Sequence, residues 1–253
     1  MIRPWLYPLL FFTGLLAGFV DSIAGGGGLI TIPVLLNLGL PPQDALGTNK
    51  LQASFGSGSA TWHYGRAGLI DFRSCWNGIV FTAIGAGLGT WLLTRMSRDL
   101  LQQVIPWLLF AIAGYMLFQP KVGEKDIHPR FDAGVFHLLF GLVLGFYDGF
   151  FGPGTGTFWA LAYMLGLGFN MTRATAHTKV MNVTSNLVSL GVFLAGGHVH
   201  LGAGLCMGTG QFLGARLGSR VVLRNGTRLI RPIFVTVAIA ITARLLWQNL
   251  TSP

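Results

Sequence analysis

Two stretches of this chain repeat one pattern, and this duplication limits the fold more than any other feature. Residues 18–50 read GFVDSIAGGGGLIT, an apolar run and ALGTNK, whereas residues 145–179 read GFYDGFFGPGTGTF, an apolar run and ATAHTK. Asp21 and Asp148 lie 127 positions apart and the final lysines lie 129 apart, so a two-residue insertion or deletion separates the copies. Duplication in a very apolar chain is typical of transporters, which often bind substrate where broken helices of the two repeats meet.

The composition predicts a membrane protein. Of the 253 residues, 52% are hydrophobic and only 10% are charged, whereas about a quarter of the residues of a soluble domain are charged. Apolar runs follow one another almost without pause, as in polytopic membrane proteins. The longest hydrophilic segment, residues 119–132, has only fourteen residues, too few for a soluble catalytic domain. Since no paired nucleophile and base or metal cluster is evident, we expect no enzyme activity, no metal ion and no cofactor.

The formal net charge of +9 would suggest a nucleic-acid partner for a soluble protein. Here the arginines and lysines lie mostly in short loops, where such residues set membrane topology. We therefore expect the lipid bilayer and a small anionic substrate as partners, and no nucleic acid. Cys75 and Cys206 lie in apolar segments and are expected to be reduced packing residues. We interpret the apolar N-terminus as a retained helix and not as a cleaved signal peptide.

Each copy divides into five apolar segments, which predicts an all-α polytopic membrane protein of two homologous repeats. The segments cover residues 5–20, 29–40, 45–64, 74–95 and 99–119 in the first copy, and 132–147, 157–168, 173–195, 201–223 and 228–249 in the second. Residues 1–119 would form the first transmembrane repeat, 120–131 a cytoplasmic linker and 132–253 the second repeat. The second segment of each copy would reach only about 18 Å, short of a hydrocarbon core of about 30 Å. We therefore expect about eight to ten membrane segments, with the second of each repeat short or re-entrant.

The distribution of positive charge favours inverted repeats. If every segment reverses direction, the side that holds the central linker collects most of the arginines and lysines, and is therefore cytoplasmic. If the short segments do not cross, the repeats are parallel and the charges nearly balance. The linker side of the inverted arrangement holds Arg66, Arg73, Lys121, Lys125, Arg130, Arg173, Arg220, Arg224, Arg228 and Arg231, and the other side holds Arg3, Arg95, Arg98 and Arg244.

Asp21 and Asp148 each follow an apolar run and precede a glycine-rich bend. A carboxylate at membrane depth costs about 2.5–3.5 kcal/mol on insertion scales, so it is usually functional. One interpretation is a proton acceptor or a residue that orients the broken helix, and the other is a cap for free amides at the next helix start. His177 is a further candidate for proton coupling, because it replaces Thr48 of the other copy and histidine titrates near physiological pH.

Lys50 and Lys179 each lie near the start of a third segment, after polar residues. These polar neighbours are Thr48 and Asn49 in one copy and His177 and Thr178 in the other. Two-fold pseudo-symmetry would bring both lysines to one axis, where ammonium groups, hydroxyls, amides and helix N-termini make an anion site. The alternative is that each lysine extends along apolar surface to the membrane interface.

The glycine runs GGGG and GPGTGT are not phosphate loops of the Walker type, because no Gly-Lys-Ser/Thr follows. They expose backbone amides to a ligand and let the helix break, or they serve only as hinges and packing positions. The candidate substrate contacts in these runs are Gly25, Gly26, Gly27, Gly28, Gly154, Thr155 and Gly156. Polar side chains of the third segments either line a path or tie helices together; they are Gln52, Asn182 and Asn186.

Pairs of glycines spaced by four recur in the fourth segments, as Gly85 with Gly89 and Gly214 with Gly218. Small residues at this spacing let membrane helices approach closely. They predict tight helix packing, and an exposed face of this kind would permit a homodimer.

These motifs resemble those of the sulfite exporter TauE/SafE family, also called TSUP. GFVDSIAGGGGLITIPVLL with ALGTNKLQ, and GFYDGFFGPGTGTF with ATAHTKVMN, look like signatures of its YfcA-type branch, and the resemblance covers nearly the whole chain. It implies a multi-pass permease of the bacterial inner membrane, with about eight spans. It also implies small sulfur-containing anions such as sulfite, thiosulfate and organosulfonates as substrates. We therefore expect a secondary transporter of such anions, and the alternatives are a passive anion channel or a membrane component of a larger complex.

Overall fold

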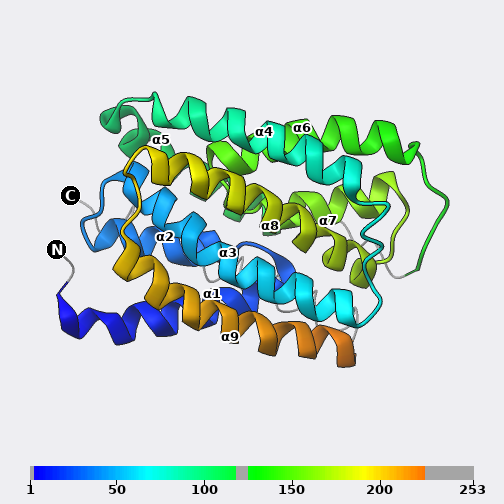
Figure 1. Ribbon diagram of the computed structural model, residues 1–253, viewed down its shortest axis with the longest axis horizontal. Helices are drawn as coiled ribbons and strands as arrows, with labels where there is room; N and C mark the ends of the chain where they lie inside the picture. The colour runs from blue at the N-terminus through cyan, green and yellow to red at the C-terminus, as the bar shows by residue number, and fades with distance from the viewer. Residues whose placement is uncertain (1–2, 118–124, 226–253) are drawn as a thin grey trace.

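The computed structural model describes residues 3–117 and 125–225, which form helices joined by short loops (Figure 1). A short 3₁₀ helix, Pro4–Leu6, precedes α1 (Tyr7–Ala24), α2 (Gly27–Asn37), α3 (Pro42–Arg66), α4 (Trp76–Thr94), α5 (Arg98–Leu117), α6 (Ala133–Phe150), α7 (Thr155–Gly166), α8 (Met171–Ala195) and α9 (Leu201–Asn225). These two ranges contain no β-strand. The predicted all-α class is confirmed, whereas the expected tenth segment, residues 228–249, lies outside the described residues.

Three of the described helical stretches are long and apolar enough to cross a membrane, namely Pro4–Ile23, Trp76–Thr94 and Ala133–Phe150. The short second segments are also present, as α2 with 11 residues and α7 with 12. At a rise of 1.5 Å per residue, each reaches only about 16–18 Å. The two longest helices of the interior, α3 and α8, have 25 residues each and bury many polar side chains.

Two pairs of parallel helices, α1 with α9 and α4 with α6, flank the molecule and pack through glycines. A Cβ on Gly14 would lie 2.1 Å from the carbonyl oxygen of Met207, and one on Gly89 would lie 2.1 Å from that of Phe146. Such contacts bring the backbones close enough for dense helix packing. The four glycines of the two predicted pairs all make close contacts of this kind; they are Gly85, Gly89, Gly214 and Gly218. Because this chain's own helices cover these faces, they give no argument for a homodimer.

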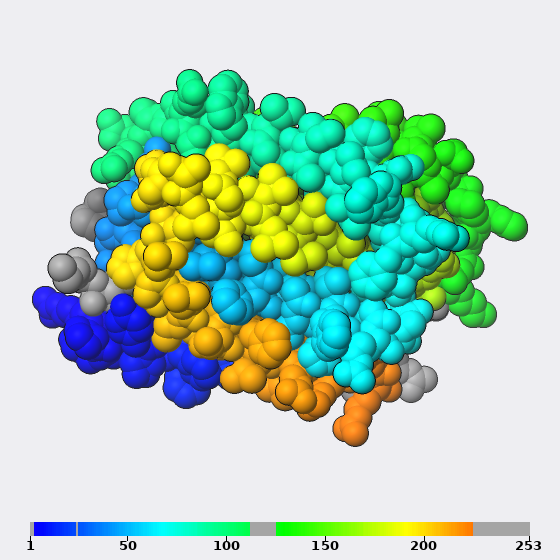
Figure 2. All heavy atoms as spheres, viewed as in Figure 1, coloured from blue at the N-terminus to red at the C-terminus, as the bar shows by residue number. Residues whose placement is uncertain are grey.

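The long helices α3 and α8 run antiparallel through the centre. At the start of α3, Asp44 Oδ1 lies 2.9 Å from Nδ1 of His198, a residue that follows the end of α8. Farther along α3, Ser57 Oγ accepts a hydrogen bond of 3.3 Å from Asn186 Nδ2, which lies before the end of α8. In Figure 1 both helices cross the middle of the molecule between the two flanking pairs, and Figure 2 shows their atoms filling the centre of the same face.

The first two helices form a hairpin that returns to the end of the molecule where it starts. Cys206 Sγ donates to the backbone oxygen of Tyr7 over 3.3 Å, so α1 begins beside the beginning of α9. The residue that precedes α9, His200, donates its backbone N–H to Thr48 Oγ1 in the first turns of α3. Since α2 leads directly into α3, the end of α2 lies near the beginning of α3, at the same end of the molecule as the start of α1.

The helices α6 and α7 form a second hairpin at the opposite end. Chain just before α6 packs on the loop after α7, where Ile127 N donates to Gly168 O over 2.8 Å and Arg130 N donates to Gly166 O over 2.8 Å. The loop then leads into α8, so this hairpin also starts and finishes at one end. Since α8 runs antiparallel to α3, the two hairpins enter the molecule from opposite ends and their bends meet in the interior.

Candidate functional site

The bends of the two hairpins touch. A Cβ on Gly25 would lie 2.9 Å from backbone atoms of Gly156, so only a residue without a side chain fits. The residues just before α2 and α7, Gly26 and Gly154, have φ angles of 93° and 82°, in the left-handed region that favours glycine. The N-termini of both short helices therefore converge, and each helix N-terminus carries roughly half a positive charge. Some of their N–H groups already donate within the protein, such as Gly27 N to Asp21 Oδ1 and Thr155 N to Gly152 O.

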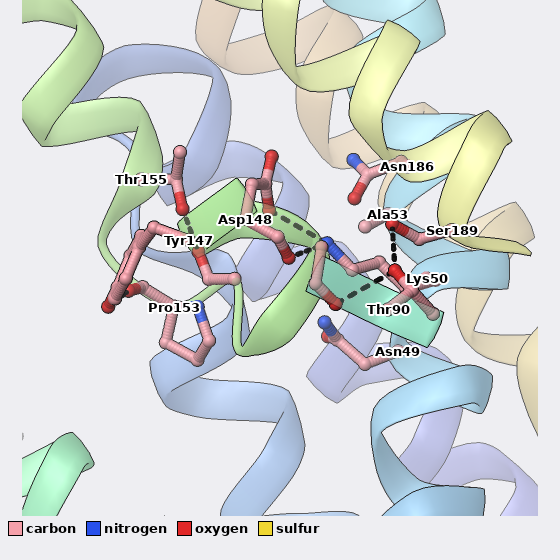
Figure 3. Close-up of polar contacts among 12 residues, drawn as sticks. Asn49, Lys50, Ala53, Thr90, Tyr147, Asp148, Pro153, Thr155, Asn186 and Ser189 are labelled. Carbon is pink, nitrogen blue, oxygen red and sulfur yellow. Dashed lines mark hydrogen bonds and ion pairs between the residues drawn. The ribbon is translucent and has the colours of Figure 1, made fainter. Parts of the chain in front are cut away.

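Each of the two predicted lysines pairs with the aspartate of the other half of the chain. Lys50 Nζ lies 2.7 Å from Asp148 Oδ1 and donates to the backbone oxygen of the same residue over 2.5 Å (Figure 3). Lys179 Nζ lies 3.2 Å from Asp21 Oδ2 and also donates to the Asp21 backbone oxygen. The lysine is the ninth residue of its helix in both cases, counted from the first residues of α3 and α8.

These two ion pairs are buried. The exposed fraction is 2% for the Lys50 side chain and 5% for Asp148, and 1% for Lys179 and 17% for Asp21. Neither lysine extends toward a surface, so the packing observed excludes the alternative of a lysine at the membrane interface. Taking such charges out of water costs about as much as their mutual attraction returns, so stability alone does not account for them. Intramembrane ionisable residues are instead typical of transport pathways.

A small cavity of about 30 Å³ lies between the two bends and the ion pairs. This volume is large enough to hold a water molecule. Among the described residues, Asn182 Oδ1 and Gln211 Oε1 are buried and have no hydrogen-bond partner, so the lining offers polar groups to a ligand or to water. The lining residues are Asp21, Gly26, Gly28, Asn49, Lys50, Ala53, Asp148, Gly152, Gly154, Thr155, Gly156, Asn182, Asn186 and Gln211.

Asn49 is held in a fixed orientation beside this cavity. Its Oδ1 accepts hydrogen bonds from Thr31 Oγ1 over 2.6 Å and from Gln52 Nε2 over 2.7 Å. With Oδ1 occupied, the Nδ2 donor faces Gly28, where an added Cβ would lie 3.6 Å away. The side chain thus presents a donor to the same cavity as the helix N-termini.

Most of the predicted site residues gather here. Nine of them line the cavity: Asp21, Gly26, Gly28, Asn49, Lys50, Asp148, Gly154, Thr155 and Gly156. Lys179 joins them through its ion pair with Asp21, and Gly25 forms the contact between the bends. Gly27 N donates to Asp21 Oδ1 over 3.3 Å, a contact of the kind that the cap interpretation expects. The ion pair of Asp21 with Lys179 was expected by neither interpretation, and proton coupling at this residue stays a prediction.

Three predicted residues lie elsewhere. Thr48 accepts the backbone N–H of His200 at the start of α3. Thr178 Oγ1 donates to Ala174 O over 2.8 Å within its own helix, so its hydroxyl is already occupied. His177 lines a separate cavity and not the one between the bends. The structure therefore supports a substrate contact for neither threonine, and a proton-coupling role for His177 stays a prediction.

The sequence also left functional candidates unassigned. The sequence allows Asn182 and Asn186 either to line a substrate path or to tie helices together. It does not mark Ala53, Gly152 or Gln211 as substrate contacts, although all five residues line the cavity. A Cβ on Gly152 would lie 3.1 Å from Lys50 Nζ, so this glycine makes room for the ammonium group. Gln211 carried a usable signal, because an amide side chain inside an apolar membrane helix usually has a polar partner or a ligand.

Known proteins with similar sequences are membrane transporters. The family described as "Sulfite exporter TauE/SafE" matches residues 10–245 of this chain. The "Probable membrane transporter protein YfcA" of Escherichia coli (strain K12) is 47% identical over 249 residues, covering 98% of this chain and 93% of the relative. "Probable membrane transporter protein ORF9" of Sinorhizobium sp is 48% identical over 241 residues (95% and 92% covered). A "Probable membrane transporter protein" of Haemophilus influenzae is 46% identical over 244 residues (96% of each).

Proposed function

The chain belongs to the sulfite exporter TauE/SafE family, and on that premise we propose that it is a secondary transporter of small anions, sulfite, thiosulfate or organosulfonates foremost. Its relatives are named as membrane transporters, so the chain is a membrane protein that moves a small substrate across a lipid bilayer. The substrate class rests on the family, which is that of sulfite exporters, and on the charges at the centre of the molecule. We assign the site to the cavity between the two bends.

The observation that carries this proposal is the convergence of two helix N-termini on a cavity beside two buried lysines. The N-termini of α2 and α7 favour negative charge, as at many oxyanion sites in proteins. Lys50, Lys179 and the Asn49 amide add donors of the kind that bind oxyanions strongly. The glycines of the bends let an anion approach the backbone N–H groups. No other charged cluster among the described residues combines these features with burial.

Binding of an anion must rearrange the ion pairs, because each lysine is already neutralised by an aspartate. An anion that takes the place of the Asp21 carboxylate at Lys179 leaves that carboxylate largely buried and without a cation. Uptake of one proton restores neutrality, since an unpaired buried charge is costly. We therefore propose that one proton is transported with the anion. Asp21 is better suited to this exchange than Asp148, because its ion pair is longer and its side chain more exposed.

We further propose that the two repeats, 1–119 and 132–253, are inverted. The antiparallel course of α3 and α8 and the opposite entry of the two hairpins support this arrangement. A hairpin that returns to its starting end adds no crossing, so an odd number of crossings per repeat remains even though the short helices do not span. The linker between the repeats then faces the cytoplasm, in agreement with the positive-inside rule. In bacteria the protein is a multi-pass component of the inner membrane.

Thermal unfolding of the purified protein with a panel of anions tests the assignment. The panel contains sulfite, thiosulfate, sulfoacetate, sulfate and simple carboxylates. A ligand present at 100 times its dissociation constant adds about 2.7 kcal/mol to the free energy of unfolding. We expect stabilisation by sulfur oxyanions and its loss in the variant Asp21→Asn/Lys179→Met, which removes one ion pair without leaving an unpaired charge. Equal stabilisation of this variant would remove the pair from the site.

A passive channel is distinguished by flux. The central cavity of about 30 Å³ is small for a conducting path, which favours a carrier. Anion uptake into vesicles that saturates and accelerates with anion on the opposite side is expected of a carrier. Uptake that ignores the anion on the opposite side would support the channel.

A further inference from the structure

A second cavity of about 350 Å³ lies at the end of the molecule where the chain before α6 meets the loop between α7 and α8. Its volume falls within the range of small-molecule sites. It shares no lining residue with the central cavity. The lining residues are Asp71, Ser74, Pro129, Phe131, Asp132, Ala133, His137, Tyr163, Leu167, Phe169, Arg173 and His177.

His177 is buried at this cavity with one ring nitrogen unsatisfied. The residue is 1% exposed. Its Nδ1 lies 2.9 Å from the backbone oxygen of Arg173, and its Nε2 has no hydrogen-bond partner within residues 3–117 and 125–225. Because a carbonyl oxygen only accepts, Nδ1 carries the proton, and the neutral ring offers Nε2 as a bare acceptor. The residue at the matching position of the other half, Thr48, has its hydroxyl occupied by His200 N, so the unsatisfied acceptor is particular to this end.

Arg173 supplies a cation at the same cavity. Its guanidinium carbon lies 3.9 Å from the centre of the Phe169 ring, so the planar group is stacked on an aromatic face. No carboxylate of the described residues lies within ion-pair distance of it. The N–H groups around the edge of a stacked guanidinium suit the oxygens of an acid group.

Two carboxylates also line the cavity, so the lining as a whole is not simply cationic. Asp71 Oδ1 accepts from the backbone N–H groups of Arg73 and Ser74 over 3.0 and 3.3 Å, and Asp132 Oδ2 accepts from Gly134 N over 2.8 Å. Backbone donors therefore hold both carboxylates in place at the cavity. One guanidinium and two carboxylates favour a ligand that carries a positive group as well as an acid group.

We propose that this second cavity binds a small zwitterion, an amino acid whose acid group is a sulfonate or a carboxylate. The acid group lies on the Arg173 guanidinium, and the ammonium group donates to His177 Nε2 on the side of the two aspartates. Tyr163 and Phe169, whose ring centres lie 5.7 and 4.9 Å from that of His177, wall the apolar middle of the ligand. The site is separate from the anion site between the bends and does not depend on it.

Calorimetric titration of the purified full chain with taurine, ethanesulfonate and ethylammonium tests this proposal. Ethanesulfonate lacks the ammonium group and ethylammonium lacks the acid group. Each lost charge-assisted hydrogen bond should weaken binding by about tenfold or more. We expect taurine to bind at least about tenfold more tightly than either fragment. β-Alanine, measured alongside, identifies whether the sulfonate or the carboxylate is preferred. Taurine that binds no more tightly than the fragments would overturn the proposal without any variant.

Two variants locate the binding. Arg173→Met should bind taurine no better than ethylammonium, and His177→Phe should bind it no better than ethanesulfonate. Matched controls exist outside both cavities. Arg95 also stacks on an aromatic ring, 4.9 Å from Trp91, and His63 makes the same bond to a backbone oxygen four residues earlier. Arg95→Met and His63→Phe should leave taurine binding unchanged.

The variant Asp21→Asn/Lys179→Met tests whether taurine binds at the second cavity or at the central site. It should lose anion transport and keep taurine binding, because the second cavity contains neither residue. Taurine binding that is lost in this variant and kept in Arg173→Met would show that taurine occupies the central site, and the proposal would be wrong.

Discussion

At the scale of single residues, the central observation is the exchange of partners between the two halves of the chain. Two-fold symmetry with a shared anion would suggest that Lys50 and Lys179 face each other. Instead, each lysine faces the aspartate of the other half. The positive and negative charges of the two ion pairs therefore balance. Under the proposed function, an anion has to compete with the carboxylates for the lysines, and this competition would couple anion binding to a change of protonation or of structure.

Removing one partner of an ion pair should lower the free energy of unfolding more than replacing both partners with uncharged residues. Lys179→Met leaves the Asp21 carboxylate without its cation, which typically lowers the free energy of unfolding by about 3–5 kcal/mol. Asp21→Asn/Lys179→Met should recover most of that loss. Thermal unfolding in detergent measures both. If the double variant is no more stable than the single one, the pair does not interact as described.

Gly25 should tolerate no side chain. Ala at this position takes a φ of 76° and places its Cβ 2.9 Å from the backbone of Gly156. Gly39→Ala is the matched control, because Gly39 has a φ of 84° and nothing within 4 Å of an added Cβ. The control measures the cost of a positive φ, about 1–2 kcal/mol in the left-handed region. Gly25 has a ψ of 172°, in a region almost confined to glycine, which adds to the cost of its own substitution. We expect Gly25→Ala to lose more stability than the control and to lose anion binding. Equal losses would show that the bends do not touch.

The sequence predicted residue identities better than residue partners. The glycine runs, the aspartates and the lysines stand out because charge and backbone freedom are rare and costly in an apolar chain. The lysine–aspartate exchange could not be predicted, because it depends on how the two hairpins meet in space. Gln211 was missed because it reaches the cavity from α9, a helix outside the two copies of the Asp-to-Lys motif.

At the scale of elements, length was the most informative signal. The short second segments are short helices in the structure, since 11 or 12 residues of α-helix cannot span a bilayer. What length could not show is that each short helix turns back beside the helix before it. Counted by segments alone, a short segment that does not cross the membrane makes the two repeats parallel. In a hairpin, however, neither the short helix nor the helix before it adds a net crossing to its repeat. A short segment that does not cross is therefore also compatible with inverted repeats.

In the flanking helix pairs, the cost of replacing a glycine should depend on whether that glycine faces the neighbouring helix. Gly89→Val places its Cβ 2.1 Å from the carbonyl oxygen of Phe146 and must push α4 away from α6. Gly87→Val is the matched control on the same helix, since its Cβ lies 3.6 Å from Val188, an ordinary contact. We expect a large fall in melting temperature for the first variant and a small one for the second. Similar melting temperatures would contradict the helix packing described.

At the scale of the whole molecule, inversion predicts that the two ends face different compartments. Lys125 and Arg95 are exposed at opposite ends of the described structure. In a background without Cys75 and Cys206, Lys125→Cys should react with a membrane-impermeant maleimide only from the cytoplasmic side, and Arg95→Cys only from the outside. Labelling of both cysteines from the same side would overturn the proposed topology.

The all-α class, the membrane location and the family were accessible from the sequence, because hydropathy and the duplicated motifs determine them. The substrate was not, because discrimination among small substrates depends on the geometry of a binding cavity and not on hydropathy or repeats. If the proposed anion site is correct, a cavity of about 30 Å³ must widen to admit an ion such as sulfite or thiosulfate.

The most direct test of the anion site is counterflow in vesicles that contain the purified full chain. Vesicles are preloaded with unlabelled sulfite or thiosulfate, and uptake of the labelled anion is followed from outside. With the unaltered protein, we expect the labelled anion to accumulate transiently inside the vesicles above its equilibrium level. With the variant Asp21→Asn/Lys179→Met, reconstituted as a folded protein, we expect no such accumulation. Accumulation that persists in the folded variant would contradict the assignment of the site to the lysine–aspartate pairs.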